Sequence, residues 1–251
     1  MPTALVTGAS SGIGAAFARR LSGDGYDVIV VARRRERLDQ LHEQCAASEL
    51  IVADLAEPEQ CARVEERLSA GVDLLVNNAG VGVGKAFEQS TVSEEDRMLA
   101  LNVRAVMRLT HAAAAPMLAA GSGQIVNVAS VAAFTGAVGF ASYSASKAYV
   151  VTLSESLAVR YACRGVTVMA LCPGYVRTEM HDAASTPTSG LVARLMWLDP
   201  EQLVEVALRD LRRGKVISTP GVVYKTTVAT TKLVPRKVLA VAGRFANRDG
   251  Q

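Results

Sequence analysis

Short, unbroken apolar runs alternate with longer stretches of helical pattern along almost the whole chain. The apolar runs are rich in Val, Ile, Leu and Ala, as is typical of strands that are buried on both faces of a parallel sheet. They lie at Thr3–Thr7, Asp27–Ala32, Leu50–Asp54, Leu74–Asn77, Gln124–Ser130, Val166–Cys172 and Val216–Thr219. Helices are predicted between them, near residues 12–22, 34–47, 57–70, 93–120, 142–164 and 200–213. This alternation predicts an α/β fold with a doubly wound, parallel, seven-stranded sheet in a three-layer α/β/α arrangement.

The pattern predicts a single domain over residues 1–251. No linker, repeat or low-complexity segment interrupts the alternation. Half of the residues are hydrophobic and 20% are charged, which indicates a globular protein with a sizeable core. Two segments depart from the pattern: residues 179–199 form a long irregular insertion, and residues 220–251 form a basic C-terminal extension that is expected to be helical.

Other features of the sequence narrow the class of protein. The apolar runs are too short to span a bilayer, and strand-like residues begin at Thr3, which leaves no room for a signal peptide. The four cysteines show no paired spacing, so we expect reduced thiols in a cytoplasmic protein. The three histidines are scattered. We therefore expect no metal site. We also expect no nucleic-acid partner.

A glycine-rich turn, Thr7–Gly14, joins the first predicted strand to the first predicted helix. Glycines allow the backbone to turn sharply and to approach a pyrophosphate, and the start of the helix offers free N–H groups with a partial positive charge. In this position the turn predicts a dinucleotide site of the Rossmann type. The expected contacts are Gly8, Ser10, Ser11, Gly12, Ile13 and Gly14.

The end of the second predicted strand indicates which dinucleotide binds. An acidic residue there would bind the ribose hydroxyls of NAD, but this chain has Ala32 followed by three arginines. A guanidinium would bind a 2′-phosphate with about 1.5–3 kcal/mol, enough for a tenfold to hundredfold preference. We therefore predict NADP(H), with Arg33 as the contact. Arg34 and Arg35 are interpreted as the solvated start of a helix.

The ends of the third and fourth predicted strands also carry polar residues. Asp54 has two interpretations: it accepts a hydrogen bond from the adenine amino group, or it caps the turn ahead of Glu57. The residues of Asn77–Gly80 are ones that commonly form turns. Because they follow a central strand, they are also placed to line the cofactor crevice. The expected contacts here are Asp54, Leu55, Asn78, Ala79 and Gly80.

The basic C-terminal part has two interpretations. From Val206 onward there are ten Lys or Arg residues and two acidic residues, Asp210 and Asp249, so this part has a net charge of +8. The whole chain has a net charge of +3, so the preceding residues sum to −5. We favour a solvated rim around the phosphates of the cofactor. The alternative is an anionic partner, such as a membrane surface.

Tyr143 and Lys147 are four residues apart in a predicted helix, with Ser130 upstream. Residues at i and i+4 share a helix face, so the phenol and the ammonium would lie side by side. A nearby cation lowers the pKa of a phenol from about 10, and such a phenol exchanges protons near neutral pH. Carbonyl reduction and alcohol oxidation both need this exchange. The same spacing also describes an ordinary surface pair, so the rest of the chain decides between the two.

Together these residues resemble the short-chain dehydrogenase/reductase family with a TGxxxGxG fingerprint. The match covers almost the entire chain and comprises Thr7-Gly8, Gly12, Gly14, Asp54, Asn77–Gly80, Asn102, Ser130, Tyr143, Lys147, Pro173-Gly174 and Thr178. The resemblance implies that Tyr143 is the general acid and that Ser130 hydrogen-bonds the substrate oxygen. It also implies that Lys147 holds the ribose and lowers the pKa of Tyr143, and that Asn102 keeps a water in a proton relay.

The resemblance extends to the remaining cofactor contacts and to the substrate. It implies that the nicotinamide is lined by Pro173, Gly174, Val176 and Thr178. Residues 179–199 correspond to the substrate lid of the family. An apolar substrate is expected to meet Val138, Phe140, Met180 and Trp197. The alternative is a lid helix that simply packs on the core.

The function predicted from the sequence is NADPH-dependent reduction of an apolar ketone or 3-oxoacyl compound to a secondary alcohol. The tail from Gly221 to Arg248, with Pro235-Arg236-Lys237, resembles a ketone- or ketoacyl-reductase subset of the family. The alternatives are NADP-dependent oxidation of a secondary alcohol and a non-catalytic NADP-binding sensor, which would not need Ser130 or Tyr143. The resemblance implies a homodimer or homotetramer formed through 93–120 and 142–164, although these helices would equally serve intrachain packing.

Overall fold

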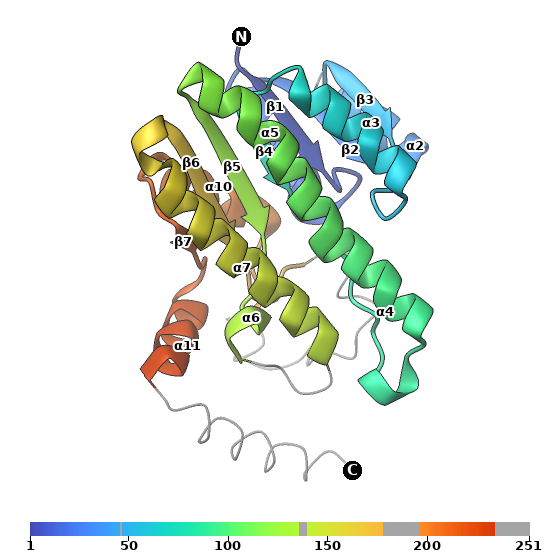
Figure 1. Cartoon of the computed structure of the whole chain (residues 1–251), viewed down its shortest axis with the longest axis vertical. Coiled ribbons are helices and arrows are strands. Elements are labelled where there is room, and N and C mark those ends of the chain that lie inside the picture. The colour runs from blue at the N-terminus through green and yellow to red at the C-terminus, as the bar shows by residue number, and fades with distance from the viewer. Residues whose placement is uncertain (46, 136–139, 178–195, 234–251) are drawn as a thin grey trace.

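A seven-stranded parallel sheet forms the centre of the computed structural model, which describes residues 1–45, 47–135, 140–177 and 196–233 (Figure 1). The strands are β1 (Thr3–Thr7), β2 (Asp27–Ala32), β3 (Glu49–Val52), β4 (Leu74–Asn77), β5 (Gly123–Val128), β6 (Val166–Leu171) and β7 (Ile217–Ser218). Their order is β3-β2-β1-β4-β5-β6-β7. The predicted doubly wound fold is confirmed. The order reverses between β1 and β4, which is where ligands bind in sheets of this kind.

Helices cover both faces of the sheet. They are α1 (Gly12–Gly23), α2 (Arg35–Cys45), α3 (Pro58–Ser69), α4 (Val92–Leu99), α5 (Val106–Ala120), α6 (Ala132–Thr135), α7 (Ala141–Tyr161), α10 (Pro200–Arg212) and α11 (Val222–Leu233). One face packs on α1, α2 and α10, and the other packs on α3, α5 and α7. Figure 1 shows α5 and α7 lying across the same face.

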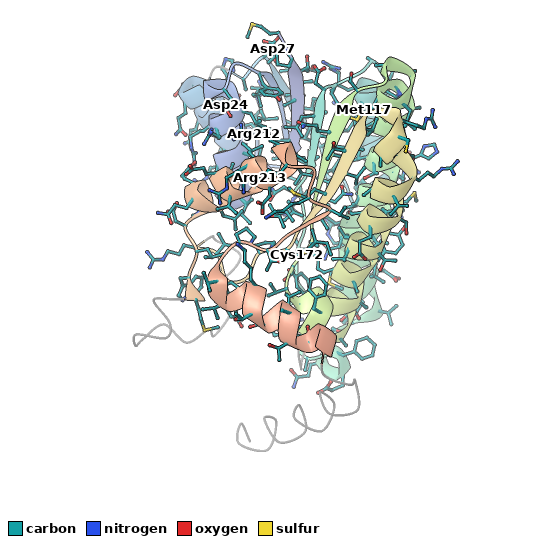
Figure 2. All side chains as sticks on the ribbon, turned by 90° about the vertical axis from the view of Figure 1, so that its left-hand side faces the viewer. Asp24, Asp27, Met117, Cys172, Arg212 and Arg213 are labelled. Carbon is teal, nitrogen blue, oxygen red and sulfur yellow. The ribbon has the colours of Figure 1, made fainter. Side chains whose placement is uncertain are left out.

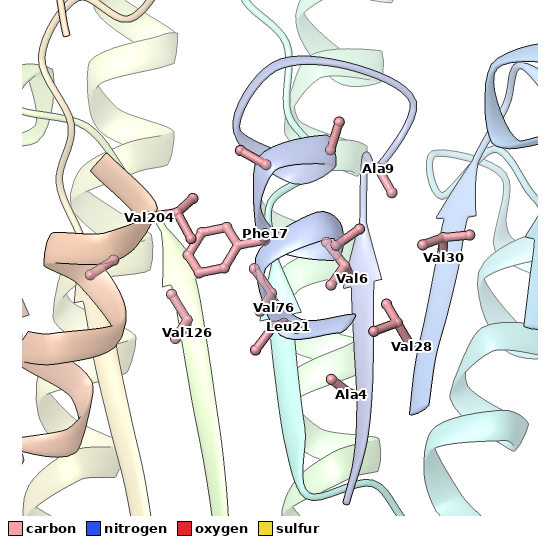
Figure 3. Packing of buried hydrophobic residues seen from close by; sticks show 14 of the residues in the cluster. Ala4, Val6, Ala9, Phe17, Leu21, Val28, Val30, Val76, Val126 and Val204 are labelled. Atoms are coloured by element: carbon pink, nitrogen blue, oxygen red, sulfur yellow. The ribbon is translucent and has the colours of Figure 1, made fainter. Parts of the chain in front are cut away.

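Alternate residues of each strand contribute to the two halves of the core. In β1, Val6 packs toward α1, while Leu5 belongs to the cluster on the opposite face. Figure 3 shows Phe17 of α1 beside Val204 of α10, above the strands. Both faces of the central strands are therefore apolar, which explains why their sequences form unbroken apolar runs.

Four predicted strands extend further in the sequence than in the structure, two of them by two residues at the carboxyl end. The runs that end at Asp54 and Ser130 leave the sheet at Val52 and Val128. The Asp54 carboxylate accepts from the Ala56 N–H (3.0 Å). Ser130 Oγ accepts in the same way from the Ala132 N–H (3.1 Å). These polar side chains start turns at the carboxyl edge of the sheet and so enter the crevice.

The long helix predicted at 93–120 is interrupted. It comprises α4, a π-helical segment η2 (Ala100–Ala105) and α5. The short elements η1 (Phe87–Gln89) and α6 are not predicted, because three or four residues carry no periodic pattern. The α11 helix agrees with the expected helical extension as far as Leu233. None of the described helices is long and apolar enough to cross a membrane.

Candidate active site

A cavity of about 470 Å³ lies at the carboxyl ends of the strands, around the point where the strand order reverses. It brings together most of the residues predicted to bind cofactor or substrate oxygen. Its lining includes Gly8, Ser10, Ser11, Gly12, Ile13, Arg33, Arg34, Asp54, Leu55, Asn78, Ala79, Gly80, Ser130, Tyr143, Lys147, Pro173, Gly174 and Val176. Of the other predicted residues, Gly14 lies behind this surface, and Val138, Thr178 and Met180 lie outside the described residues.

Thr7 and Asn78 hold the glycine-rich turn against the end of β4. Thr7 Oγ1 accepts hydrogen bonds from the backbone N–H groups of Asn78 (2.9 Å) and Ala79 (3.0 Å). In return, the Asn78 amide donates to the carbonyls of Thr7 (2.9 Å) and Gly8 (3.2 Å). Six polar groups are paired within two turns, so the cradle keeps its shape without a ligand.

The glycines of this turn are required by close contact. A Cβ on Gly14 would lie 2.4 Å from the Gly8 oxygen and 2.5 Å from Asn78 Nδ2. Gly8 and Gly12 have φ angles of 65° and 54°, which side chains disfavour. Ser11, the N-cap of α1, makes no side-chain cap, and the first turn carries no acidic residue. The N–H groups of that turn therefore suit an anion, and the cradle fits a dinucleotide pyrophosphate.

Two arginines, not one, reach the cavity from the end of β2. Arg33 lies 3.8 Å from the Asp54 carboxylate. Arg34 donates to the hydroxyls of Ser10 and Ser11, each at 3.0 Å, and so lies against the glycine-rich turn. Arg34 is exposed and directly precedes α2, as the interpretation of a solvated helix start requires, but its guanidinium also lines the cavity. Arg35 pairs with Asp39 (2.9 Å), as an exposed helix residue does.

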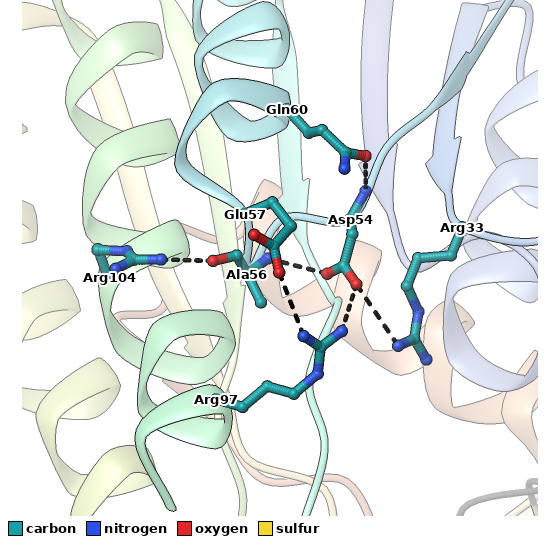
Figure 4. A network of polar contacts seen from close by, with 7 residues as sticks. All are labelled: Arg33, Asp54, Ala56, Glu57, Gln60, Arg97 and Arg104. Carbon is teal, nitrogen blue, oxygen red and sulfur yellow. Dashed lines mark hydrogen bonds and ion pairs between the residues drawn. The ribbon is translucent and has the colours of Figure 1, made fainter. Parts of the chain in front are cut away.

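Asp54 lies at the centre of a network of polar contacts (Figure 4). One carboxylate oxygen accepts from the Ala56 N–H, and the other forms ion pairs with Arg97 and Arg33. The Asp54 N–H is held by Gln60 (2.8 Å). The turn-capping interpretation is thus confirmed. The adenine contact stays a prediction, with the carboxylate on the cavity wall.

Tyr143 and Lys147 lie one turn apart at the start of α7 and face the same cavity. Lys147 Nζ lies 5.8 Å from the centroid of the Tyr143 ring and donates to the Val128 carbonyl (3.0 Å). Only 4% of Lys147 is exposed. Burial lowers the pKa of Lys147 to about 8, while the thiol of Cys172, itself fully buried (Figure 2), acts in the opposite direction. A buried ammonium with one acceptor among the described residues is suited to donate to ligand hydroxyls.

The expected lowering of the Tyr143 pKa is wrong for the protein alone. Burial raises this pKa, and the Ser130 hydroxyl opposes the rise. The reason is that burial disfavours the phenolate, and the ammonium of Lys147, 5.8 Å from the centroid of the ring, has its own charge weakened by burial. The phenol therefore holds its proton near neutral pH, which suits a proton donor.

Asn102 connects the π-helical segment to the cavity wall. Its side chain exchanges two hydrogen bonds with the backbone of Val81 (2.8 and 2.9 Å) and donates to Ser146 Oγ (3.2 Å). A Cβ on Gly80 would lie 3.2 Å from both Asn102 Oδ1 and Lys147 Nζ. Asn102 thus positions the segment beside Lys147. Its role in a water relay stays a prediction.

Tyr224 supports the wall formed by Pro173, Gly174 and Val176, and the sequence analysis missed it. A Cβ on Gly174 would lie 2.0 Å from the Tyr224 ring. The Tyr224 hydroxyl accepts from the Tyr175 N–H (3.0 Å) and donates to the Met196 carbonyl (2.6 Å). No local pattern indicates this contact, because it joins segments 49 residues apart.

The predicted substrate residues do not all come together. Phe140 and Tyr143 line a second, smaller cavity beside the main one. Trp197 instead lines a cleft on the other side of the glycine-rich turn, with Arg19 and Arg177. Its ring stacks at a tilt against Tyr175, with 5.8 Å between centroids. Among the described residues, Trp197 therefore does not meet the reacting end of the crevice.

Comparisons with known proteins agree with this geometry. A family model described as short chain dehydrogenase matches residues 2–188. An acetoacetyl-CoA reductase from Rhizobium meliloti (strain 1021) is 37% identical over 70% of this chain and 75% of its own length. The bulky-bulky ketone specific alcohol dehydrogenase from Comamonas testosteroni is 36% identical, with a TM-score of 0.78 over 88% of this chain and 86% of its own. A short-chain dehydrogenase from Sphingobium yanoikuyae, solved with NADPH, is 34% identical, with a TM-score of 0.81 over 88% and 89%.

Proposed function

The chain belongs to the short-chain dehydrogenase family, and we propose that it is an NADPH-dependent reductase of an apolar ketone or 3-oxoacyl-type compound. The observation that carries the proposal is the placement of Tyr143. It retains its proton, interacts with Ser130, and shares one cavity with Lys147 and the glycine-rich turn. A site that only binds the dinucleotide has no need of a half-buried proton donor beside a hydroxyl.

The cofactor proposal rests on charge and shape. The first turn of α1 offers N–H groups to a pyrophosphate, and Arg33 and Arg34 offer guanidinium groups to a 2′-phosphate. The Sphingobium enzyme binds NADPH with a similar fold. Bound NADPH would supply the hydride. Lys147, buried and directed into the cavity, would donate to the ribose hydroxyls.

The protein's own contribution is position and a proton. Ser130 Oγ already accepts from the Ala132 N–H, so its hydroxyl hydrogen remains to be donated to a substrate oxygen or to Tyr143. Tyr143 donates a second hydrogen bond to the same carbonyl oxygen and transfers its proton as the oxygen gains negative charge. Because burial raises the Tyr143 pKa, the proton is present at neutral pH.

The substrate class is supported by the apolar surroundings of Tyr143 and by two relatives. Phe87, Met98 and Phe140 line the small cavity beside it. The Comamonas enzyme is described as specific for bulky ketones, and the Rhizobium enzyme as a reductase of acetoacetyl-CoA. Oxidation of a secondary alcohol uses the same residues in reverse, so the ratio of reduced to oxidised cofactor would set the direction.

The experiment is a substrate screen with the purified protein. NADPH consumption is followed with aliphatic ketones, aromatic ketones and 3-oxoacyl thioesters, and the reverse reaction is followed with secondary alcohols and NADP⁺. We expect turnover of at least one ketone class, and a slower reaction with NADH. If NADPH binds tightly but no compound in either direction reacts, the protein is a dinucleotide-binding sensor and the reductase proposal is wrong.

We further propose that the chain works as one domain, in the cytoplasm, as a homodimer or homotetramer. The assembly is supported by apolar side chains on the outer surface of α5 and α7: Met107 is 40% exposed, Tyr149 41% and Val159 79%. Exposed apolar side chains mark a protein interface where they form one contiguous patch, whereas single ones are normal on a monomer. Light scattering should give a mass two or four times that of the chain, and Val159→Asp should lower it. A monomer at micromolar concentration would contradict the proposal.

A further inference from the structure

A second cavity adjoins the reacting end of the crevice and shares Tyr143 with it. Its free volume is about 10 Å³, which is room for one small polar group. Apolar side chains, Phe87, Met98 and Phe140, form much of its lining. The polar members of the lining include Lys85 and Glu95.

Glu95 brings an unsatisfied acceptor to this cavity. Its Oε1 accepts from the Ser90 hydroxyl (2.6 Å). Its Oε2 is buried and has no hydrogen-bond partner within the part of the chain that the structure describes. A buried acceptor without a donor destabilises the site until a donor arrives, more so when the acceptor is charged.

The neighbouring charged residues that the structure describes do not donate a hydrogen bond to Glu95 Oε2. Lys85 pairs with Glu94 (2.6 Å), and Glu94 also closes the capping box with Thr91 at the start of α4. Glu94 therefore caps α4 and pairs with Lys85. Glu95 takes no part in these contacts and lines the cavity. Lys85 also lines the cavity, so its ammonium would repel a second cation there.

We propose that Glu95 selects substrates with a hydroxyl group at a distance from the reacting carbonyl. The carbonyl would lie against Tyr143 and Ser130 in the main cavity, the apolar part would extend toward Phe140, and only the hydroxyl would enter the small cavity and donate to Glu95 Oε2. This inference rests on the proposed function, since it names a feature of the substrate of that same site. A hydroxyl is favoured over an ammonium because Lys85 lies in the same cavity.

The test compares matched pairs of ketones. The probes are straight-chain methyl ketones from butanone to heptanone, each with and without a terminal hydroxyl group. For the pair of the right length, the wild-type enzyme should show a kcat/KM about 10- to 100-fold higher for the hydroxylated member. Glu95→Leu should bring the ratio of the two constants close to one. The ratio does not depend on the fraction of folded enzyme.

Two further variants keep the test decisive. If Glu95→Leu does not fold, Glu95→Gln, which keeps the volume but loses the charge, should lower the ratio to a smaller extent. Glu88→Gln, an exposed carboxylate in η1 outside the cavity lining, should leave the wild-type ratio unchanged.

The outcomes separate the two proposals. Equal constants for every pair in the wild type, or a preference that survives Glu95→Leu, would overturn the role of Glu95 and leave the reductase proposal standing. Absence of turnover for all ketones, with NADPH bound, would overturn the reductase proposal and this inference with it.

Discussion

At the cofactor end of the crevice, close steric contacts fix the shape of the glycine-rich turn. At the substrate end, burial instead sets the pKa values of the polar side chains. Gly8, Gly14 and Asn78 leave no room for another atom. Tyr143 and Lys147 instead lie in a desolvated wall, where burial shifts both pKa values away from those of free side chains. We therefore expect an added side-chain atom at the cofactor end to cause a large loss of cofactor affinity. At the substrate end, we expect stability and activity to change gradually with pH and with the loss of single polar groups.

Among the effects on stability and cofactor binding, the largest is expected from crowding the cofactor end. Gly14→Ala places a Cβ 2.4 Å from the Gly8 oxygen, so the turn must shift. We expect the variant to lose about 3 kcal/mol of unfolding free energy and at least about 100-fold in NADPH affinity. The control is Gly23→Ala in the same helix, where a Cβ meets nothing within 4 Å. Equal NADPH affinity in the two variants would contradict the steric account.

The next largest effect is expected on the pH dependence of the unfolding free energy, through the titration of Lys147. Because burial lowers its pKa from 10.5 to about 8, the unfolded chain binds more protons than the folded chain between these values. The unfolding free energy of the wild type should therefore rise with pH across this window, relative to Lys147→Met, by up to about 3 kcal/mol. Denaturant unfolding of both proteins at several pH values measures the difference. Parallel curves would show that Lys147 is not desolvated.

The cofactor preference should depend on both arginines that line the cavity. Arg33→Ala and Arg34→Ala should each weaken NADPH binding about 10- to 100-fold and leave NADH binding nearly unchanged. Arg35→Ala, which breaks an exposed pair with Asp39, should alter NADPH binding less than about twofold. Fluorescence titration with both cofactors checks these values. A wild-type preference for NADH would overturn the prediction.

The smallest effect is expected at Tyr224, which supports the substrate end from α11. Tyr224→Phe leaves the Tyr175 N–H and the Met196 carbonyl without their partner, which should cost about 1–2 kcal/mol of unfolding free energy. Tyr26→Phe, at a residue whose hydroxyl makes no hydrogen bond to the described residues, should cost less than about 0.5 kcal/mol. Equal unfolding midpoints for the two variants would show that the Tyr224 hydroxyl bonds contribute little.

Much of the fold and of the cofactor end follows from the sequence, because both depend on local patterns. Unbroken apolar runs predict the parallel strands, and the turn at Thr7–Gly14 predicts the cradle. The i, i+4 spacing likewise predicts that Tyr143 and Lys147 share a face. The direction of the Tyr143 pKa is not predictable in this way, since it depends on burial by segments distant in the chain.

The residues that were missed share one property: their partners are set by tertiary structure. Arg34 lies within a run of arginines that looks solvated, and Glu95 lies within an acidic run at a helix start. Tyr224 contacts a segment 49 residues away. Trp197 shows the converse error, since its apolar neighbours in sequence predict a substrate contact, but the structure places it beside a different cleft.

The most direct test of the account is the rate of carbonyl reduction by Tyr143→Phe at saturating NADPH, with a ketone that the wild type reduces. The phenyl ring keeps the cavity wall but has no proton to give. We predict that kcat falls by about 10²- to 10⁴-fold while the variant still binds NADPH. A variant that reduces the ketone at the wild-type rate would contradict the assignment of Tyr143 as the proton donor.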